Sequence, residues 1–141
     1  MTLATQPAAP DRDVAERNRA LVLRLMRAMD KCDAETIREI IAPDATWWVL
    51  GVGTLDRETV IGQLQALLGD ARVAETAILG TTAEGERVAV ESKGNFEFAD
   101  GRVYRNNYHH LYTVRDGRVI GVREYLDLQI TEAVFGAMGN S

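Results

Sequence analysis

The chain has 141 residues, 46% of them hydrophobic, which is enough to form one domain with its own core. Its formal net charge of −5 argues against nucleic acid as a partner, because binding to phosphates requires clustered Lys and Arg. Its apolar runs are far shorter than the ~20 residues of a membrane span, so no membrane segment is expected.

The two ends of the chain differ in composition from the rest. Residues 1–12 are rich in Ala, Thr and Pro, and they lack the basic start and the apolar segment of a signal peptide. We expect a disordered arm over residues 1–12, a single domain over 13–137 and a flexible C-terminus at 138–141. Cys32 is the only cysteine, which excludes an intramolecular disulfide and favours a cytoplasmic location.

Three helices are predicted in the first half of the chain. Apolar residues recur at helical spacing on one side of residues 13–30, which predicts an amphipathic helix. Asp33 is placed to cap a second, short helix that Pro43 ends, and Asp56 is placed to cap a third helix. Between the second and third helices, residues 45–50 are predicted to form a strand that a glycine loop follows.

Four strands are predicted in the second half, over residues 73–82, 87–98, 103–114 and 118–128. Turn sequences such as Asp100-Gly101 and Asp116-Gly117 join consecutive strands as hairpins, which predicts a curved antiparallel sheet. Because the helices come first and the strands follow, the fold class is α+β, with the helices covering one face of the sheet.

Glu124 is an acidic residue in an otherwise aliphatic row. One face of the last strand is predicted to carry Ile120, Val122, Glu124, Leu126 and Leu128, and the other face begins with Val119. A buried carboxylate is costly unless it is paired, hydrogen-bonded or protonated, and burial raises its pKa towards the range useful for acid–base catalysis. The alternative is a residue near a strand end that reaches water or a buried arginine.

The strand at 103–114 divides its side chains between two faces. One face carries Tyr104, Asn106, Tyr108, His110, Tyr112 and Val114. His109 points to the opposite face from His110, so the only two histidines cannot bind one metal ion together, and no metal site is predicted. The mixed aromatic and polar face suits the wall of a ligand cavity, and it suits equally an ordinary core with tyrosine hydroxyls at its rim.

Two arrangements are open for the strand at 87–98. Val88, Val90 and Phe96 share one face, whereas Glu91 and Lys93 share the other. If the outer face of the sheet is solvated, Glu91 and Lys93 point to water. If a second copy of the chain covers an apolar outer face, Glu91 and Lys93 turn inward to the pocket, and the protein is a homodimer joined through the sheet.

Several segments together carry a resemblance to a known family. Residues 41–47 read Ile-Ala-Pro-Asp-Ala-Thr-Trp, 100–108 read Asp-Gly-Arg-Val-Tyr-Arg-Asn-Asn-Tyr, and 123–127 read Arg-Glu-Tyr-Leu-Asp. Over roughly residues 14–135 the chain resembles the SnoaL-like branch of the nuclear-transport-factor-two-like superfamily. The resemblance implies a conical α+β barrel of three N-terminal helices packed on a strongly curved antiparallel sheet around one deep apolar pocket. It also implies dimers that pair through the outer sheet face.

The same resemblance implies a range of activities, because the superfamily includes ketosteroid isomerases, polyketide cyclases, epoxide hydrolases, lyases, dehydratases and non-catalytic binding proteins. Cyclases and epoxide hydrolases carry an acid on the last strand, at the position of Glu124. The epoxide hydrolases hold a water molecule with four polar residues whose positions correspond to Trp47, Val49, Glu91 and Lys93 here. These four departures argue against epoxide hydrolysis.

We therefore expect a cofactor-independent isomerase, lyase or cyclase that acts by general acid–base proton transfer on a small, largely apolar carbonyl- or hydroxyl-bearing molecule. The predicted catalytic residues are Glu124, His110, Tyr108 and Glu91. The predicted substrate-binding residues are Trp47, Asn106, Lys93, Val122 and Leu126. The expected partners are a small apolar molecule and a second copy of the chain, without nucleic acid or membrane. The alternatives are a non-catalytic binding protein with the same pocket and a structural dimerisation module.

Overall fold

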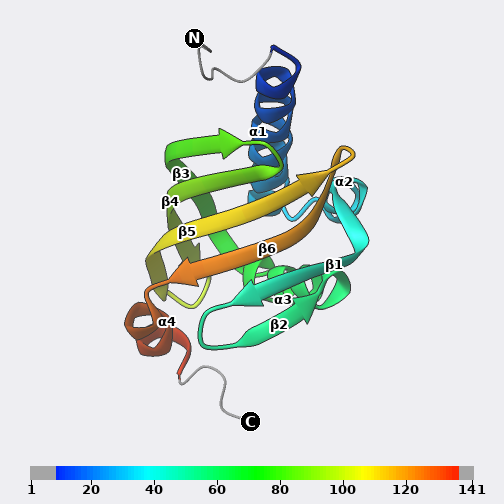
Figure 1. The fold of residues 1–141 in the computed structure, drawn as a ribbon. Helices are drawn as coiled ribbons and strands as arrows, with labels where there is room; N and C mark the ends of the chain where they lie inside the picture. Colours follow the sequence, from blue (N-terminus) through cyan, green and yellow to red (C-terminus); the bar gives the residue numbers. More distant parts are fainter. Residues whose placement is uncertain (1–8, 137–141) are drawn as a thin grey trace.

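The computed structural model describes residues 9–136, which form an α+β fold of N-terminal helices and a six-stranded sheet (Figure 1). The elements in chain order are α1 (Ala9–Asp30), α2 (Ala34–Ile40), β1 (Ile41–Val49), β2 (Gly53–Asp56), α3 (Arg57–Leu68), β3 (Ala71–Glu84), β4 (Arg87–Phe98), β5 (Val103–Arg115), β6 (Arg118–Leu126) and α4 (Leu128–Phe135). The predicted α+β class is confirmed, and the three predicted helices precede the long strands β3 to β6.

The sheet is mixed rather than wholly antiparallel, which corrects the prediction. Its strand order is β2-β1-β6-β5-β4-β3, and the three hairpins of β3 to β6 are antiparallel as expected. The first strand, β1, pairs in parallel with the last, β6. Hairpin signals fix the direction only of strands that follow one another along the chain, and many residues separate β1 from β6. The expected glycine loop after β1 contains the short strand β2, which pairs antiparallel with β1.

The helix caps agree with the sequence, and the helix ends differ in part. Asp33 and Asp56 accept hydrogen bonds from the backbone N–H groups of Thr36 (3.2 Å) and Thr59 (2.8 Å), so both predicted N-caps are confirmed. Helix α1 begins at Ala9, four residues before the predicted start. The remainder of the predicted arm, residues 1–8, lies outside the described residues, as do residues 137–141 with the predicted C-terminal tail.

A fourth helix, α4, which the sequence pattern did not predict, follows the sheet. β6 ends at Leu126, and Asp127 caps α4 by accepting hydrogen bonds from the backbone N–H groups of Gln129 (3.0 Å) and Ile130 (3.4 Å). Leu128 therefore belongs to a helix and not to the aliphatic row of the last strand. No helix within residues 9–136 is long and apolar enough to cross a membrane.

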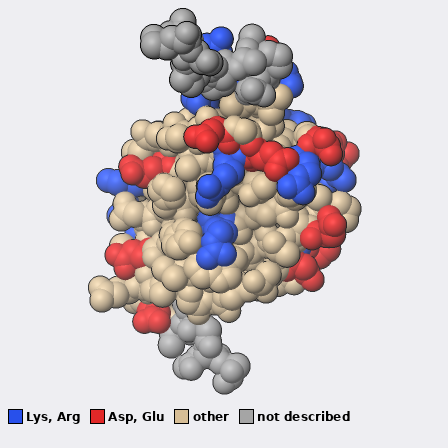
Figure 2. All heavy atoms as spheres, in the orientation of Figure 1, with Lys and Arg blue, Asp and Glu red and all other residues tan. Residues whose placement is uncertain are grey.

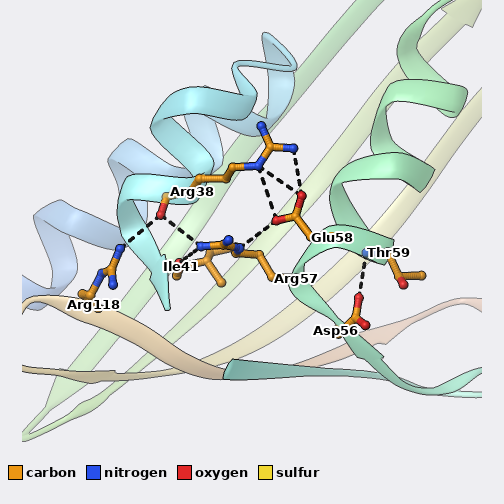
Figure 3. A network of polar contacts seen from close by, with 7 residues as sticks. All are labelled: Arg38, Ile41, Asp56, Arg57, Glu58, Thr59 and Arg118. Atoms are coloured by element: carbon orange, nitrogen blue, oxygen red, sulfur yellow. Dashed lines mark hydrogen bonds and ion pairs between the residues drawn. The ribbon is translucent and has the colours of Figure 1, made fainter. Parts of the chain in front are cut away.

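A network of arginines joins α2 to the start of α3 and to β6 (Figure 3). Arg38 of α2 makes a two-pronged ion pair with Glu58 of α3, with nitrogen–oxygen distances of 2.9 and 3.1 Å. Arg57 donates to the carbonyl of Ile41 (3.3 Å), and Arg118 donates to the carbonyl of Arg38 (3.2 Å). These bonds satisfy carbonyls at the C-terminal end of α2, where a helix leaves its last acceptors unpaired.

The inner face of the sheet is the apolar one, and β4 shows which residues lie on it. Val88 and Val90 are fully buried in a core that includes Val22, Leu25 and Met26 of α1, and Phe96 is nearly buried in a second cluster beside α3 and α4. Glu91 and Lys93 are exposed on the opposite face. Of the two arrangements left open by the sequence, the one with Glu91 and Lys93 turned inward is not observed, because Val88 and Val90 belong to the core. The homodimer stays a prediction, but this argument for it no longer holds.

The outer side of the molecule carries charges of both signs. In the view of Figure 2, acidic and basic side chains are interspersed around the rim, and Lys or Arg groups lie near the middle of the face. The described part of the chain thus shows on this side no extended surface of one charge, such as a phosphate backbone would require.

A β-bulge changes the predicted face of one residue in β6. The β5–β6 register pairs Thr113 with Gly121 but Val114 with Val119, so Ile120 is the additional residue. Val119 is therefore fully buried in the core, although strict alternation placed it on the outer face. Beyond the bulge, towards Glu124, the alternation proceeds as predicted.

Candidate functional site

A cavity of about 370 Å³ lies between the inner face of the sheet and helices α1, α3 and α4. This volume is within the range of small-molecule sites in proteins, about 300–1,000 Å³. Its walls are mostly apolar and include Met26, Met29, Leu64, Leu126 and Phe135. Residues with hydrogen-bonding groups interrupt the apolar lining at a few positions, and Glu124 is one of them.

Glu124 is held by side chains from the two strands beside it. The indole Nε1 of Trp47, on β1, donates a hydrogen bond to Glu124 Oε1 (2.8 Å). The Nε2 atom of His110, which faces Glu124 across the β5–β6 pair, lies 3.4 Å from the same oxygen. The second oxygen, Oε2, receives no hydrogen bond from any residue between 9 and 136. One oxygen is thus fixed in place, whereas the other has its lone pairs available.

Two opposing effects act on the pKa of Glu124. Burial is the largest and raises it, while the hydrogen bond and positive charge of His110 and the hydrogen bond from Trp47 lower it. The lowering effects together prevail, so the pKa of Glu124 lies below its usual range. The prediction of a raised pKa is wrong, because it considered burial without these two partners. At neutral pH the site therefore contains a carboxylate, which accepts protons or hydrogen bonds.

His110 is stacked between two tyrosines of the same strand. Its ring lies 5.7 Å from that of Tyr108 and 5.5 Å from that of Tyr112, both nearly parallel. The ring of Trp47 meets it edge-on at 6.1 Å. The Nδ1 atom is buried and has no hydrogen-bond partner among the described residues, so Glu124 provides the only polar contact seen for this imidazole. Aromatic packing thus fixes the plane in which His110 approaches the carboxylate.

Tyr108 brings a hydroxyl group to the cavity wall. Burial raises the pKa of this phenol well above its usual value, and Tyr104, Glu124 and Asp30 raise it further. The phenol therefore remains protonated and can donate a hydrogen bond. A glycine underlies this ring: a Cβ on Gly94 would lie 2.9 Å from Tyr108 Cε2 and 2.6 Å from Phe96 Cε2. Any larger residue at position 94 would push these two rings out of place.

Asn106 is a predicted binding residue that has a structural role instead. Its Nδ2 donates to the Tyr104 hydroxyl (2.8 Å) and to the Asp127 carbonyl (3.0 Å), and its Oδ1 accepts from the backbone N–H groups of Asn107 (2.7 Å) and Asp127 (3.2 Å). Asn106 does not line the cavity. Its polar atoms connect β5 to the start of α4, so the prediction is corrected.

The other predicted site residues divide between the cavity and other places. Trp47, Tyr108, His110, Glu124 and Leu126 line the cavity together. Val122 is buried in the core and does not line the cavity. Glu91 and Lys93 are exposed on the outer face, since β4 presents its valines inward. The structure therefore does not place these two predicted site residues in the cavity.

The cavity also contains an acid that the sequence analysis missed, Asp30 at the end of α1. Its two oxygens accept hydrogen bonds from the backbone N–H (2.8 Å) and the hydroxyl (2.6 Å) of Thr76. Burial is the main cause that raises the pKa of Asp30, although the bonds from Thr76 oppose it. A signal was present in the sequence: Asp30 follows Val22 and Met26 at a spacing of four and so lies on the apolar side of the helix.

Within residues 9–136, no three His, Cys, Asp or Glu side chains are close enough together to hold a metal ion. The acids of the cavity lie singly on separate elements: Asp30 on α1 and Glu124 on β6. The arrangement offers acceptors, a phenol donor and an imidazole around an apolar space.

Solved structures with the same fold include candidate polyketide cyclases. One from Jannaschia sp. CCS1 is 20% identical with a TM-score of 0.76 and covers 96% of this chain and 99% of its own. IdmH from Streptomyces antibioticus is 24% identical with a TM-score of 0.73, over 84% of this chain and 98% of its own. An epoxide hydrolase of limonene-epoxide-hydrolase type from M. tuberculosis is 17% identical with a TM-score of 0.73, over 87% and 92%. At these identities the likeness concerns the fold.

Sequence comparison identifies the family. No curated protein matches the chain. The family model described as the SnoaL-like domain matches residues 22–122, which include α2, α3, all of β1 to β5 and the beginning of β6. The predicted resemblance is confirmed, and the chain belongs to the SnoaL-like domain family.

Proposed function

We propose that this protein is a cofactor-independent enzyme that transfers a proton on a small, largely apolar molecule bearing a carbonyl group. The observation that carries the proposal is the state of Glu124: a carboxylate in an apolar cavity, with one oxygen fixed by Trp47 and His110 and the other available. A fixed, partly desolvated carboxylate is a suitable general base, and such groups contribute roughly 10²–10⁴-fold to a reaction rate.

The proposed step is removal of a proton from the carbon next to the carbonyl. The C–H bond breaks, its proton moves to Glu124 Oε2, and its electron pair forms an enolate whose negative oxygen requires a hydrogen-bond donor. The protonated phenol of Tyr108, which also interacts with Tyr104, is a donor on the same wall. His110 positions the Glu124 carboxylate through Oε1. Isomerisation, aldol or retro-aldol reaction and ring closure all proceed from such an enolate.

The names of the relatives support proton transfer more than water addition. Two similar structures are named as candidate polyketide cyclases, and ring closure belongs to this class of reaction. One is named as an epoxide hydrolase, but the resemblance implies that its water-holding residues correspond to Trp47, Val49, Glu91 and Lys93 of this chain. Of these, Glu91 and Lys93 are exposed on the far side of the sheet. Epoxide hydrolysis is therefore not the proposed reaction.

A second candidate function is ligand binding without turnover in the same cavity. The lowered pKa of Glu124 favours it, because a carboxylate that holds its proton weakly is a weak base. In that case Glu124 and His110 would serve only to orient a ligand. The two functions make opposite predictions for proton exchange and agree in their predictions for binding.

The test is proton exchange on 2-tetralone, an apolar bicyclic ketone, in D₂O followed by ¹H NMR. The wild-type protein should accelerate exchange of the protons next to the carbonyl, and Glu124→Gln should reduce that rate by roughly 100-fold because the amide cannot take up a proton. Glu91→Gln is the matched control, since Glu91 is exposed on the opposite face of the sheet. Equal rates for the wild type and Glu124→Gln would leave binding as the function.

A further inference from the structure

Polar side chains cross the inner face of the sheet from strand to strand, in a line through the cavity. The polar line consists of Thr76 on β3, Ser92 on β4, Tyr108 and His110 on β5, and Glu124 on β6, all of which line the cavity. Ser92 lies beside Tyr108 in the β4–β5 register, and His110 lies beside Glu124 in the β5–β6 register. The line ends in a carboxylate on each side: Glu124 itself, and Asp30, which is bonded to Thr76.

Glu124 is on β6 and Asp30 is bonded to Thr76 on β3, so the two carboxylates belong to opposite ends of the polar line. Strands β3 and β6 are three strand spacings apart in the sheet, which is about 14 Å. Tyr108 is on β5, which lies between the strands that carry Glu124 (β6) and Thr76 (β3). Ser92 is only 1% exposed, and its hydroxyl has no partner among the described residues, so the centre of the line also contains an unused polar group.

The simplest structural role for Asp30 is to hold α1 against the edge strand β3 through Thr76. That role does not require a charge, because an asparagine could accept from the Thr76 N–H and donate to its hydroxyl. The charge is unfavourable here in two ways: it is half buried in the wall of an apolar cavity, and it lies at the C-terminus of a helix, where the helix dipole disfavours an anion. A neutral side chain would therefore serve the structure better.

We infer that Asp30 is a second recognition group of this cavity and that the ligand is an elongated apolar molecule with a hydroxyl group at the end away from Glu124. The inference rests on the proposed function, in which the carbonyl end lies against Glu124 and Tyr108. Asp30 accepts a hydrogen bond from the distant hydroxyl, and the apolar body spans the space beside the polar line. The substrate class is thus a hydroxy-ketone whose two oxygens are on opposite ends of a fused-ring or similarly rigid body.

The test compares 6-hydroxy-2-tetralone with 6-methoxy-2-tetralone, which lacks the donor, by isothermal titration calorimetry. The wild-type protein should bind the hydroxyl compound roughly tenfold more tightly, as expected for a hydrogen bond to a charged acceptor. Asp30→Asn keeps the contacts to Thr76 and should reduce the preference to about twofold or less, because a bond to a neutral acceptor is weaker. Asp33→Asn, on an exposed cap, should keep the wild-type preference. A wild type without preference, or Asp30→Asn with the full preference, would overturn the inference.

The ¹³C resonance of the Asp30 carboxyl group provides a measurement on the unaltered protein, should Asp30→Asn fail to fold. It should shift when the hydroxyl compound is added and not when the methoxy compound is added; any other result overturns the inference. Failure of the proposed function has a different signature. If Glu124→Gln leaves proton exchange unchanged while Asp30→Asn loses the hydroxyl preference, the cavity binds hydroxy-ketones without catalysis.

Discussion

Replacing Trp47 by phenylalanine should reveal how much the hydrogen bond from Trp47 to Glu124 contributes to the stability of the fold. The change removes the indole N–H that donates to Glu124 over 2.8 Å and keeps an aromatic ring against His110 and Tyr112. A hydrogen bond to a charged group contributes about 1.5–3 kcal/mol, and the space left by the smaller ring adds about 1 kcal/mol. We therefore expect the free energy of unfolding at neutral pH, measured in urea, to fall by about 2.5–4 kcal/mol.

The neighbouring Trp48 provides the matched control, because the same substitution there affects the opposite face of the sheet. Trp48 is half-buried and stacks under Arg123, whose guanidinium carbon lies 4.1 Å from the ring centroid. A phenyl ring retains much of that contact, so Trp48→Phe should cost less than about 1 kcal/mol. Equal decreases in the free energy of unfolding for Trp47→Phe and Trp48→Phe would show that the bond from Trp47 to Glu124 contributes nothing to stability.

The loss of stability caused by Trp47→Phe should also depend on pH, in a direction that follows from the pKa of Glu124. The pKa of Glu124 is lower in the folded chain than its ordinary value, so its bonds stabilise the fold above the unfolded pKa and are lost as the pH falls through the folded pKa. The difference in the free energy of unfolding between wild type and Trp47→Phe should therefore be largest at neutral pH and become smaller in the acid range. A difference that does not change with pH would refute the assignment of the indole bond to the charged form of Glu124.

Three further substitutions test other parts of the structure. Asp30→Asn should gain stability relative to the wild type as the pH rises from acid to neutral, because the raised pKa of Asp30 means that its ionisation disfavours the folded state. Urea unfolding at acid and neutral pH measures this change. A variant that becomes less stable than the wild type as the pH rises would contradict the prediction. Gly94→Ala should cost about 1–3 kcal/mol and weaken 2-tetralone binding in calorimetry, because its Cβ would lie within 2.9 Å of two aromatic rings, whereas Gly62→Ala in α3 has free space and should not destabilise. Asn106→Ala should lower the free energy of unfolding by about 3 kcal/mol or more, because several buried partners lose their bonds, while Asn107→Ala at an exposed position should stay within about 0.5 kcal/mol.

Side-chain alternation along one strand could be predicted from the sequence, because backbone geometry fixes it. The face of β5 that carries His110 and Tyr112 is buried as predicted, and His109 is exposed. The same rule gave the correct face for Glu124 and the wrong one for Val119, since a bulge between the two adds a residue to β6. Nothing in the local pattern marked that bulge, because it depends on the pairing with β5.

Properties that depend on what packs against an element were beyond the sequence pattern. The residues of β4 alternate as predicted, but whether Val90 or Glu91 points inward depends on which face α1 covers. Asp30 was missed for a different reason. An acid in an apolar row is evident on a strand such as that of Glu124, where the row repeats every two residues, and less evident on a helix, where the row repeats every three to four residues.

The parallel pairing of β1 with β6 has a consequence for the order in which the chain folds. Trp47 and Glu124 are bonded to one another across 77 positions of sequence, and Leu50 donates its backbone N–H to the carbonyl of Glu124 (3.0 Å). β1 emerges early in synthesis, yet its place beside β6 is filled only after the last strand has been made. Contacts between such distant segments form slowly. The hairpins of β3 to β6 can assemble in sequence, and we expect the bond between Trp47 and Glu124, which completes the candidate site, to form after them.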